Sequence, residues 1–591
     1  MSFHPNDVAR RGRFASFFLV ATFVALAGAF FNTQVRRHSE YVLQSEENRL
    51  RELPIPAARG IIYDRDGRVI AENLPGYSVS VVSPSADSLR AALVRLSGTI
   101  ELTPKQIEAA VRRYARAPNR PTVVLADAPF DVVSVLEERR SEFPGLVIQS
   151  APKRYYPDGA AVAAFVGYTG EITESELASP NYKEYKTGQQ IGKGGLERQY
   201  ERELRGREGV RFVEVDARGR VVSESGLARQ DLMPEAAPPL RTSIDLELQR
   251  FVVELFGDSL IGGAMVIEPN SGEVLALHSA PTYDPNRFIG GIPASYWDSL
   301  NTDARRPLYN KVIQGRYPPA STWKLATSVI ALQEKLVRPD ERMPVPCSGG
   351  YQFGSRYFRC WDRRGHGNVN LTRAIEMSCD VYFYQLGLKM GLSRLIAGGV
   401  NLDFGQRSGI DLPDEARPRF PDKDYRAYYN KMYGARGWTS AVTLNLSIGQ
   451  GENAQTVANM ARFYTALATD GTAAKPEIVR RAPQREQLFK LSAADMDVLR
   501  AAMAGVVSQG TARASAIQGL TLAGKTGTAQ NSHGDDHAWF VGFAPANEPK
   551  IVVSVMLEFG EHGSRAARIA SSIVAKYFNR QPTQVLQTEG E

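Results

Sequence analysis

At 591 residues the chain is too long for one ordinary domain, so we expect two or three folded units. Its composition, 43% hydrophobic and 23% charged, is that of a globular protein and excludes a disordered or fibrous chain. The net charge of +7 is mild for this length, and the scattered Lys and Arg form no basic stripe, which argues against nucleic acid as a partner.

The first predicted element is a membrane anchor at residues 14–34. Residues 14–31 carry no charge, and as a helix they would span roughly 27 Å, close to the hydrocarbon thickness of a bilayer. Three arginines precede this run and favour a cytoplasmic N-terminus: Arg10, Arg11 and Arg13. We therefore predict a cytoplasmic tail at 1–13 and a single-pass protein whose remaining residues lie outside the cytoplasm.

A cleaved signal peptide is the alternative to an anchor. The tripeptide Ala27-Gly28-Ala29 resembles a small-residue cleavage site. However, Phe30 and Phe31 continue the apolar run past that site, and the core of a signal peptide is usually shorter. These residues favour the uncleaved anchor.

The residues after the anchor predict a β-rich domain over 35–235. A polar stretch at 38–51 is typical of a short helical stem, and 59–71 predicts two strands joined by an Asp-Gly turn, the strongest local hairpin pattern. Helical patterns fill roughly 86–143. Residues 192–204 predict a flexible loop that continues into a charged helix.

The Pro-rich segment 233–239 is typical of a linker and separates the first domain from a second one. Apolar strands are predicted near both ends of the second domain, at 263–268, 272–277, 537–544 and 551–557. Since the pattern between them is mostly helical, we expect an α+β domain over 240–580 whose sheet brings its two ends together. The polar residues 581–591 are predicted to be disordered.

Ser321 and Lys324 are the first candidates for chemistry. Prolines end the loop before them and an apolar periodic run follows, so Ser321 is predicted in the first turn of a helix. Because they are three residues apart, both side chains lie on one face, and the amine can reach the hydroxyl. A lysine with a lowered pKa can take the serine proton and activate the hydroxyl. On its own, S-x-x-K also occurs by chance, as a capped helix with an exposed lysine.

Two further motifs favour catalysis over that structural alternative. Ser378-Cys379-Asp380 precedes an aromatic-rich helix, and Lys525-Thr526-Gly527-Thr528 lies in a small-residue stretch before the C-terminal strands. Glycines in the last motif let a substrate backbone approach, and Lys525 supplies a cation beside the reacting centre. In this order, S-x-x-K, S-D-N and K-T-G form the signature of serine β-lactamases and penicillin-binding proteins.

With these motifs, the chain resembles the class B penicillin-binding proteins, and among them the elongation-specific group called penicillin-binding protein 2. The resemblance covers nearly the whole chain, including Arg59-Gly60, the Asp64–Gly67 turn and residues 194–197. One departure from the wider superfamily is Asp380 in place of Asn, which is usual in the elongation group; an ionised Asp cannot donate a hydrogen bond to the substrate. The resemblance implies an α+β fold with one N-terminal transmembrane helix, a β-rich pedestal and a transpeptidase domain with an antiparallel sheet and helices.

The resemblance also implies an activity, the cross-linking of peptidoglycan stem peptides during cell elongation and rod-shape maintenance, and covalent binding of β-lactams. Ser321 would attack the penultimate D-Ala carbonyl of a D-Ala-D-Ala stem peptide, with Lys324 as the base. Ser378 would relay a proton between Lys324, Lys525 and the departing D-Ala. An amine from a neighbouring stem peptide would then resolve the acyl-enzyme; water in its place gives D-Ala-D-Ala carboxypeptidase activity.

Substrate binding is implied for a second set of residues. Lys525 with Thr526 and Thr528 would hold the terminal carboxylate, and Gly527 and Asp380 belong to the same substrate-binding set. The backbone N–H groups of Thr528 and of the nucleophile would form the oxyanion hole.

A Cys3His set predicts a structural zinc site. The three cysteines, Cys347, Cys360 and Cys379, lie within 33 residues, and His366 lies in the same window. Uniform scatter would give such clustering roughly once in a hundred chains, and this ligand set suits tetrahedral Zn²⁺. The alternatives are a Cys347–Cys360 disulfide, with Cys379 as a buried thiol, or three unrelated core cysteines. Catalysis itself requires no cofactor, and some members of the resembled group carry a structural zinc in this region.

Three functions are compatible with the three motifs: a transpeptidase, a β-lactamase or β-lactam sensor, and a non-catalytic scaffold. A secreted β-lactamase would lack the pedestal, a sensor would need more membrane spans, and a scaffold would not need the intact motif residues. The sequence shows no glycan-polymerising domain. The resemblance therefore implies partnership with a membrane-embedded glycosyltransferase of the SEDS (shape, elongation, division and sporulation) family and with elongation-complex proteins, at the bacterial inner membrane with the catalytic domain in the periplasm.

Overall fold

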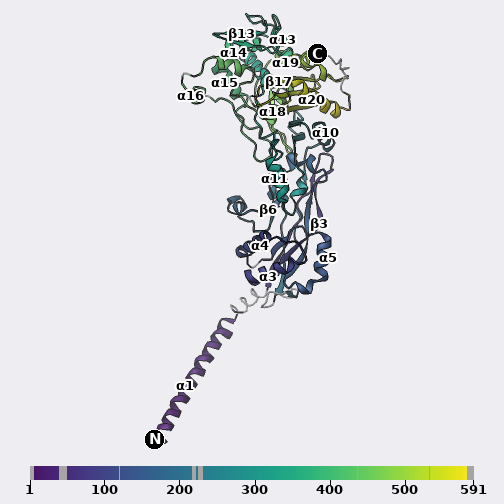
Figure 1. Ribbon diagram of the computed structural model, residues 1–591. Coiled ribbons are helices and arrows are strands. Elements are labelled where there is room, and N and C mark those ends of the chain that lie inside the picture. Colours follow the sequence, from purple (N-terminus) through teal and green to yellow (C-terminus); the bar gives the residue numbers. More distant parts are fainter. Residues whose placement is uncertain are drawn as a thin grey trace.

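The computed structural model describes residues 5–38, 41, 50–118, 120–215, 221–223, 230–422, 424–435, 437–531 and 533–581. Most of the stem predicted at 38–51, and nearly all of the disordered tail predicted at 581–591, lie outside the described residues. In Figure 1 the helix α1 (Pro5–Phe31) projects from one end of an elongated molecule, and β13 (Gly350–Phe353) lies at the opposite end.

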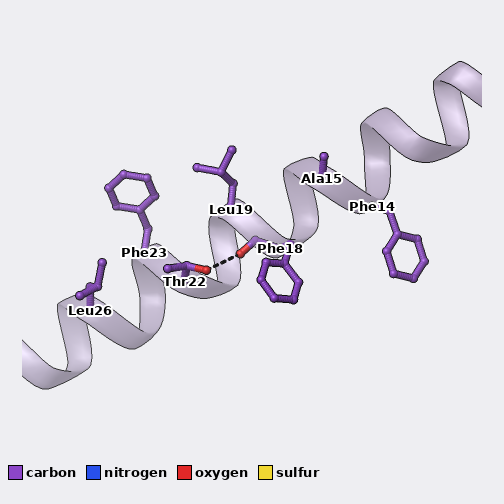
Figure 2. Close-up of a pocket in the computed structure, with 7 residues that line it drawn as sticks. All are labelled: Phe14, Ala15, Phe18, Leu19, Thr22, Phe23 and Leu26. Atoms are coloured by element: carbon purple, nitrogen blue, oxygen red, sulfur yellow. Dashed lines mark hydrogen bonds between the residues drawn. The ribbon is translucent and has the colours of Figure 1, made fainter.

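The helix α1 exposes apolar side chains and continues into a π-helical turn, η1 (Asn32–Arg36). Within its span Ala9–Arg36, a window of 18 residues has a mean hydropathy of 2.2, and among the described residues it is the one helix long and apolar enough to cross a membrane. Figure 2 shows the rings of Phe14 and Phe18 pointing away from the helix, while the Thr22 hydroxyl donates to the Phe18 carbonyl at 2.8 Å. With its polar group paired internally, the helix fits a single membrane anchor.

The body that follows the anchor is the pedestal, and its described helices and strands lie within residues 50–223. Its elements in chain order are β1 (Leu50–Ile55), β2 (Ile62–Tyr63), β3 (Val69–Val81), α3 (Ala86–Leu96), α4 (Pro104–Arg116), β4 (Thr122–Leu125), α5 (Phe130–Glu138), η2 (Arg140–Glu142), β5 (Leu146–Tyr155), η3 (Gly159–Ala161), α6 (Ala163–Val166), β6 (Thr169–Glu171), α7 (Glu174–Leu177), η4 (Pro180–Tyr182), β7 (Gln190–Gly192), α8 (Gly195–Gln199), α9 (Glu201–Leu204), β8 (Gly209–Val215) and β9 (Val221–Ser223).

The pedestal is organised by its long strand β3. The hairpin predicted at 59–71 is confirmed, because β2 pairs antiparallel with the start of β3. The rest of β3 pairs with β5 and β4. The prediction of helix throughout 86–143 is wrong at Thr122–Leu125, which forms β4: its Thr-Val-Val-Leu run is too short for a periodic pattern, and β-branched residues favour pairing with β3.

A buried ion cluster joins the start of the pedestal to its last helices. The Glu197 carboxylate accepts from Arg59 Nε at 3.0 Å and from Arg154 Nε at 2.6 Å, and it is fully buried. Burial alone would raise the pKa of Glu197, but Arg154 and Arg59 outweigh it and hold that pKa below its usual value. Arg59 also pairs with Glu201 at 2.9 Å. The segment predicted as a charged helix forms α8 and α9, and two of its carboxylates, Glu197 and Glu201, point into the protein.

Removing the Glu197 charge is expected to destabilise the pedestal. In Glu197→Gln, two guanidinium groups lose their main buried partner, so we expect a loss of about 3–5 kcal/mol of unfolding free energy. The measurement is denaturant unfolding of the full chain, followed at the pedestal transition. Glu108→Gln, in an exposed pair with Arg90, is the matched control and should leave the midpoint unchanged. An unchanged midpoint in both variants would contradict the prediction.

The segment predicted as a linker, 233–239, lies against the pedestal. A Cβ atom at Gly60 would meet the Pro238 carbonyl oxygen at 2.4 Å, so this close approach requires glycine. Directly after the segment, β10 (Leu240–Arg241) pairs in parallel with β2. The two bodies of the chain are therefore joined by main-chain pairing as well as by the connecting residues.

The second body contains the remaining elements. In chain order they are β10, α10 (Leu246–Phe256), β11 (Gly262–Ile267), β12 (Val274–Ala280), η5 (Pro285–Phe288), α11 (Ala294–Thr302), η6 (Ala320–Trp323), α12 (Lys324–Gln333), β13, β14 (Arg356–Arg359), α13 (Leu371–Glu376), α14 (Asp380–Met390), α15 (Leu392–Asn401), α16 (Tyr425–Tyr433), α17 (Ala441–Ser447), α18 (Val457–Ala468), β15 (Thr472–Ala474), β16 (Arg485–Gln487), α19 (Ala493–Ser508), η7 (Arg513–Ser515), β17 (Ala523–Ala529), β18 (His537–Ala544), β19 (Ile551–Leu557) and α20 (Gly563–Tyr577).

A five-stranded antiparallel sheet in the order β12-β11-β19-β18-β17 forms the centre of this body. As predicted, it brings the two ends of the domain together. Every residue of β11, β12 and β19 is buried, so helices must cover both faces of these strands; α10, α18 and α20 pack against them. The strand β17 lies at the edge of the sheet, where a peptide can approach it.

Candidate active site

The predicted nucleophile lies where the edge strand meets a helical core. Ser321 is half-buried in the 3-10 turn η6, directly before α12. The preceding residue, Ala320, has φ of 48°, a left-handed conformation that is costly for a residue with a Cβ atom. The N–H of Ala320 donates to Gly449 O at 2.9 Å, which ties the turn to the loop after α17. A Cβ atom at Gly527 would lie 3.0 Å from Pro319 O, so β17 packs closely on this turn.

The second motif holds the lysine of the first. Lys324 Nζ is fully buried and donates to Ser378 O at 2.8 Å, to Ser378 Oγ at 3.2 Å and to Asp380 Oδ1 at 2.7 Å. Ser378 also has a left-handed backbone, with φ of 55°. In the described residues, Lys324 makes no hydrogen bond to Ser321, although the two are three residues apart. The amine is thus turned toward the second motif in this state.

The third motif completes the arrangement. Lys525 Nζ, also fully buried, donates to Ser378 Oγ at 2.9 Å, so Ser378 lies between two lysines. Burial, followed by the charge of Lys324, lowers the pKa of Lys525 well below its usual value, and Asp380 opposes part of this shift. Burial raises the pKa of Asp380, against the attraction of Lys324. The Ser378 hydroxyl is therefore shared by two lysines. The pKa of Lys525 is lowered, and Lys324 is paired with the Asp380 carboxylate.

The substrate-binding residues predicted from the sequence occupy different positions. Thr528 is exposed on β17, whereas Thr526 is buried and its hydroxyl lies 2.6 Å from that of Thr511. Asp380 turns both carboxylate oxygens toward the protein, since Oδ2 accepts from the N–H of Trp361 at 3.0 Å. In this state Asp380 orients Lys324 and does not face an open site.

Sequence reasoning missed three residues around this centre. Thr511, named above, supports the third motif from the loop after α19, and Trp361 supports the second motif through its backbone. Gln450 Nε2 donates to Thr528 O at 3.4 Å from the opposite rim. The Gly449-Gln450-Gly451 run, a sharp turn after a helix, is the one pattern that could have indicated this rim.

The Cys3His set predicted from the sequence is brought together. The ligand atoms of Cys347, Cys360, His366 and Cys379 all lie within 4.8 Å of one another. His366 Nδ1 lies 3.6 Å from the sulfur of Cys347 and 3.5 Å from that of Cys360. Tetrahedral Zn–S and Zn–N bonds would separate such atoms by about 3.5 Å. All three cysteines are buried free thiols, and the Cys347–Cys360 disulfide is not formed.

One sulfur in this set favours the thiolate form. A hydrogen bond from Cys379, a further one with His366 and the positive charge of Lys324 hold the pKa of Cys360 well below its usual value. The proton stays on Cys379, whose pKa is raised by that same hydrogen bond and by burial. An anionic sulfur with two further thiols and an imidazole Nδ1 is a donor set that fits a divalent, thiophilic metal.

Two family models match the chain. The model described as penicillin binding protein transpeptidase domain matches residues 262–577, and the one described as penicillin-binding protein dimerisation domain matches residues 54–231. Among curated proteins, peptidoglycan D,D-transpeptidase MrdA of Acinetobacter baumannii is 33% identical over 593 residues, covering 95% of this chain and 87% of its own. MrdA of Escherichia coli K12 is 30% identical over 592 residues, covering 94% and 92% respectively.

Solved structures give a similar result. A Helicobacter pylori PBP2 chain, determined in complex with MreC, superposes with a TM-score of 0.78 at 27% identity, covering 90% of this chain and 99% of that one. Pseudomonas aeruginosa PBP2 in complex with WCK 5153 has a TM-score of 0.66 at 32% identity, covering 89% and 96%. A chain of a peptidoglycan synthase complex has a TM-score of 0.70 at 29% identity, covering 98% and 100%.

Proposed function

This chain belongs to the penicillin-binding protein family, in the group of the MrdA (PBP2) peptidoglycan D,D-transpeptidases, and on that premise we propose that Ser321 is the nucleophile of its acyl-transfer reaction. The observation that carries the proposal is the contact of all three motifs, in which Ser378 Oγ lies 3.2 Å from Lys324 Nζ and 2.9 Å from Lys525 Nζ. The substrates are stem peptides of peptidoglycan, and β-lactams acylate the same serine.

The reaction proceeds in two acyl transfers. Ser321 Oγ attacks the penultimate D-Ala carbonyl, the peptide bond to the last D-Ala breaks, and that D-Ala leaves as an amine after taking a proton. An amine of a neighbouring stem peptide then attacks the ester, and Ser321 Oγ regains its proton. Attack by water in place of the amine gives D-Ala-D-Ala carboxypeptidase activity. These steps need no cofactor.

The two lysines divide the proton transfer. Lys324 Nζ lies 2.7 Å from Asp380 Oδ1, and an amine that carries all three protons cannot accept another. Lys525, with its lowered pKa, can take a proton from Lys324 through the Ser378 hydroxyl, to which both amines are hydrogen-bonded. Lys324 then becomes neutral and accepts the Ser321 proton. The terminal carboxylate of the substrate binds at the edge strand β17, to the residues of the third motif: Lys525, Thr526, Gly527 and Thr528.

The test of the proposed function is the site of acylation. The full chain in detergent is labelled with a fluorescent penicillin, digested and mapped by mass spectrometry. We expect a stable adduct on Ser321. Rapid turnover of the drug would instead indicate a β-lactamase, and an adduct on another residue would refute the assignment.

Replacing Asp380 by asparagine is expected to shift the pH dependence of acylation. The acylation rate rises with pH as a lysine becomes neutral, and Asp380 raises the pKa of Lys525. Removing the Asp380 charge lowers the pKa of Lys525, so the rise of the acylation rate with pH moves to lower pH, by about one to three units. The measurement is the penicillin acylation rate from pH 5 to 10. Asp362→Asn, whose carboxylate pairs with Arg364, is the control and should not move the limb.

The Cys3His set is proposed to hold one structural Zn²⁺. With four protein ligands the metal would be closed to water and would stabilise the second motif, since Cys379 lies between Ser378 and Asp380. We expect about one zinc per chain by metal analysis of the purified protein, and loss of the metal in Cys360→Ser. His562→Gln, an exposed histidine outside the set, is the control. A metal-free protein with a mapped Cys347–Cys360 bridge would contradict this.

The placement of the chain follows from its anchor. We propose a cytoplasmic tail at 1–13, an anchor at 14–34, a pedestal at 35–235 and a transpeptidase domain at 240–580 in the periplasm, because three arginines in the first part of α1 precede its uncharged run. Of the related structures, one was determined with MreC and one within a peptidoglycan synthase complex. By that likeness, we propose elongation-complex proteins and a SEDS-family glycosyltransferase as partners.

A further inference from the structure

The strand β14 and the loop that follows it present a basic surface. We call it the basic face and define it by Arg356, Tyr357, Arg359, Trp361, Arg363 and Arg364, all of which are exposed. Residues 356–364 carry four arginines against one carboxylate, Asp362. Only Arg364 has a carboxylate partner among the described residues, and that pair is long, at 3.5 Å. Arg359 and Arg363 therefore present guanidinium groups to solvent, ready for carboxylates of a ligand.

Two aromatic side chains in the basic face are both exposed and fixed. Trp361 has 55% of its surface exposed, yet its Nε1 donates to Met377 O at 2.9 Å and its backbone N–H donates to Asp380. Tyr357 is 51% exposed and lies over Gly350, where a Cβ atom would meet the ring at 2.4 Å. Exposed rings that are held in place lose little entropy on binding and are typical of recognition surfaces.

The basic face borders the active site on one side. The Trp361 backbone N–H donates to Asp380 Oδ2, and Asp380 Oδ1 accepts from Lys324, so the Trp361 backbone is joined through two hydrogen bonds to a catalytic lysine. The edge strand β17, proposed to take the donor peptide, contacts Ser378 through a different residue, Lys525. With β17 taken by the donor peptide, the basic face offers a second peptide an exposed surface that is joined to the second motif by hydrogen bonds.

We propose that the basic face binds the acceptor stem peptide through its carboxylates, with the arginines as ion-pair donors and Trp361 and Tyr357 as its apolar floor. This inference rests on the proposed function and names its second substrate site. Stem peptides are anionic, which matches the excess of arginine. An anionic membrane is a less suitable partner, because β13 and this loop lie at the end of the molecule opposite α1 (Figure 1).

The test compares two charge-reversed proteins. Arg359→Glu/Arg363→Glu alters the basic face, and Arg394→Glu/Arg568→Glu makes the same charge change at exposed arginines elsewhere in the domain. The full chain in detergent is first converted to its penicillin acyl-enzyme. Binding of N-acetyl-L-Ala-γ-D-Glu-meso-diaminopimelate, and of the same peptide with amidated carboxyls, is then measured by calorimetry.

We expect the basic-face variant to bind the acidic peptide about 10-fold more weakly or worse, and the amidated peptide within about 2-fold of the parent. The control variant should bind both like the parent, and the parent's affinity for the acidic peptide should fall as salt rises. Equal effects on both peptides, an equal effect of the control, or no effect at all would overturn the inference. If Ser321 is labelled normally and the basic-face variant binds the acidic peptide like the parent, only the acceptor-site inference is overturned. If the parent is not labelled at Ser321, the proposed function is overturned as well.

Discussion

Ser321→Ala is expected to abolish covalent labelling by penicillin and to lower the cross-linking rate by a factor of about 10⁴ or more. The variant retains both lysines and the edge strand, but no oxygen remains to form the ester. Binding of the drug should persist without an adduct, since the carboxylate-binding residues are unchanged. Intact-mass spectrometry after labelling, together with a cross-linking assay on nascent peptidoglycan, measures both effects.

Ser328→Ala is the matched control, because it removes a serine hydroxyl from α12, the helix that directly follows the η6 turn of Ser321. Ser328 is buried one turn beyond Lys324, and its hydroxyl donates only to the Lys324 carbonyl at 2.8 Å. This variant should label at the parent's rate. An adduct that survives in Ser321→Ala would show that another residue is acylated.

The fold could be predicted where local pattern is strong. The Asp-Gly turn predicts the β2–β3 hairpin and the apolar runs at 263–268 and 272–277 predict strands, and the structure confirms the hairpin and forms β11 and β12 at those runs. The strand β4 was missed, because Thr122–Leu125 is short and is held by pairing with β3. Such pairing depends on residues distant in the sequence, which a local pattern does not contain.

The sequence predicts which residues form the active site, but it does not predict which hydrogen bonds they make. The spacing of Ser321 and Lys324 predicts that they lie on one face, yet it does not reveal that Lys324 turns to Asp380. The Asp380 carboxylate was expected among the substrate-binding groups. Its second oxygen is occupied by Trp361, a contact between segments whose proximity only the folded chain provides.

Lys525 carries the second large expected effect. In Lys525→Ala, Ser378 loses one of its two amine partners, the proton path from Lys324 ends at the hydroxyl, and the terminal carboxylate loses its cation. We expect acylation by penicillin to fall by about 10³-fold. Lys311→Met is the control, since Lys311 is also a buried lysine of this domain, with a pKa lowered to about 8, and takes no part in the site. Its acylation rate should stay close to that of the parent.

Lys525→Arg separates the two roles of this lysine. A guanidinium keeps the positive charge for the carboxylate but cannot become neutral, so it cannot receive the proton that Lys324 must release. We therefore expect Lys525→Arg to recover much of the apparent affinity for penicillin while the maximal acylation rate stays as low as in Lys525→Ala. If arginine restores the maximal rate, Lys525 acts as a fixed cation only. The lowered pKa produced by its burial beside Lys324 would then have no role in proton transfer.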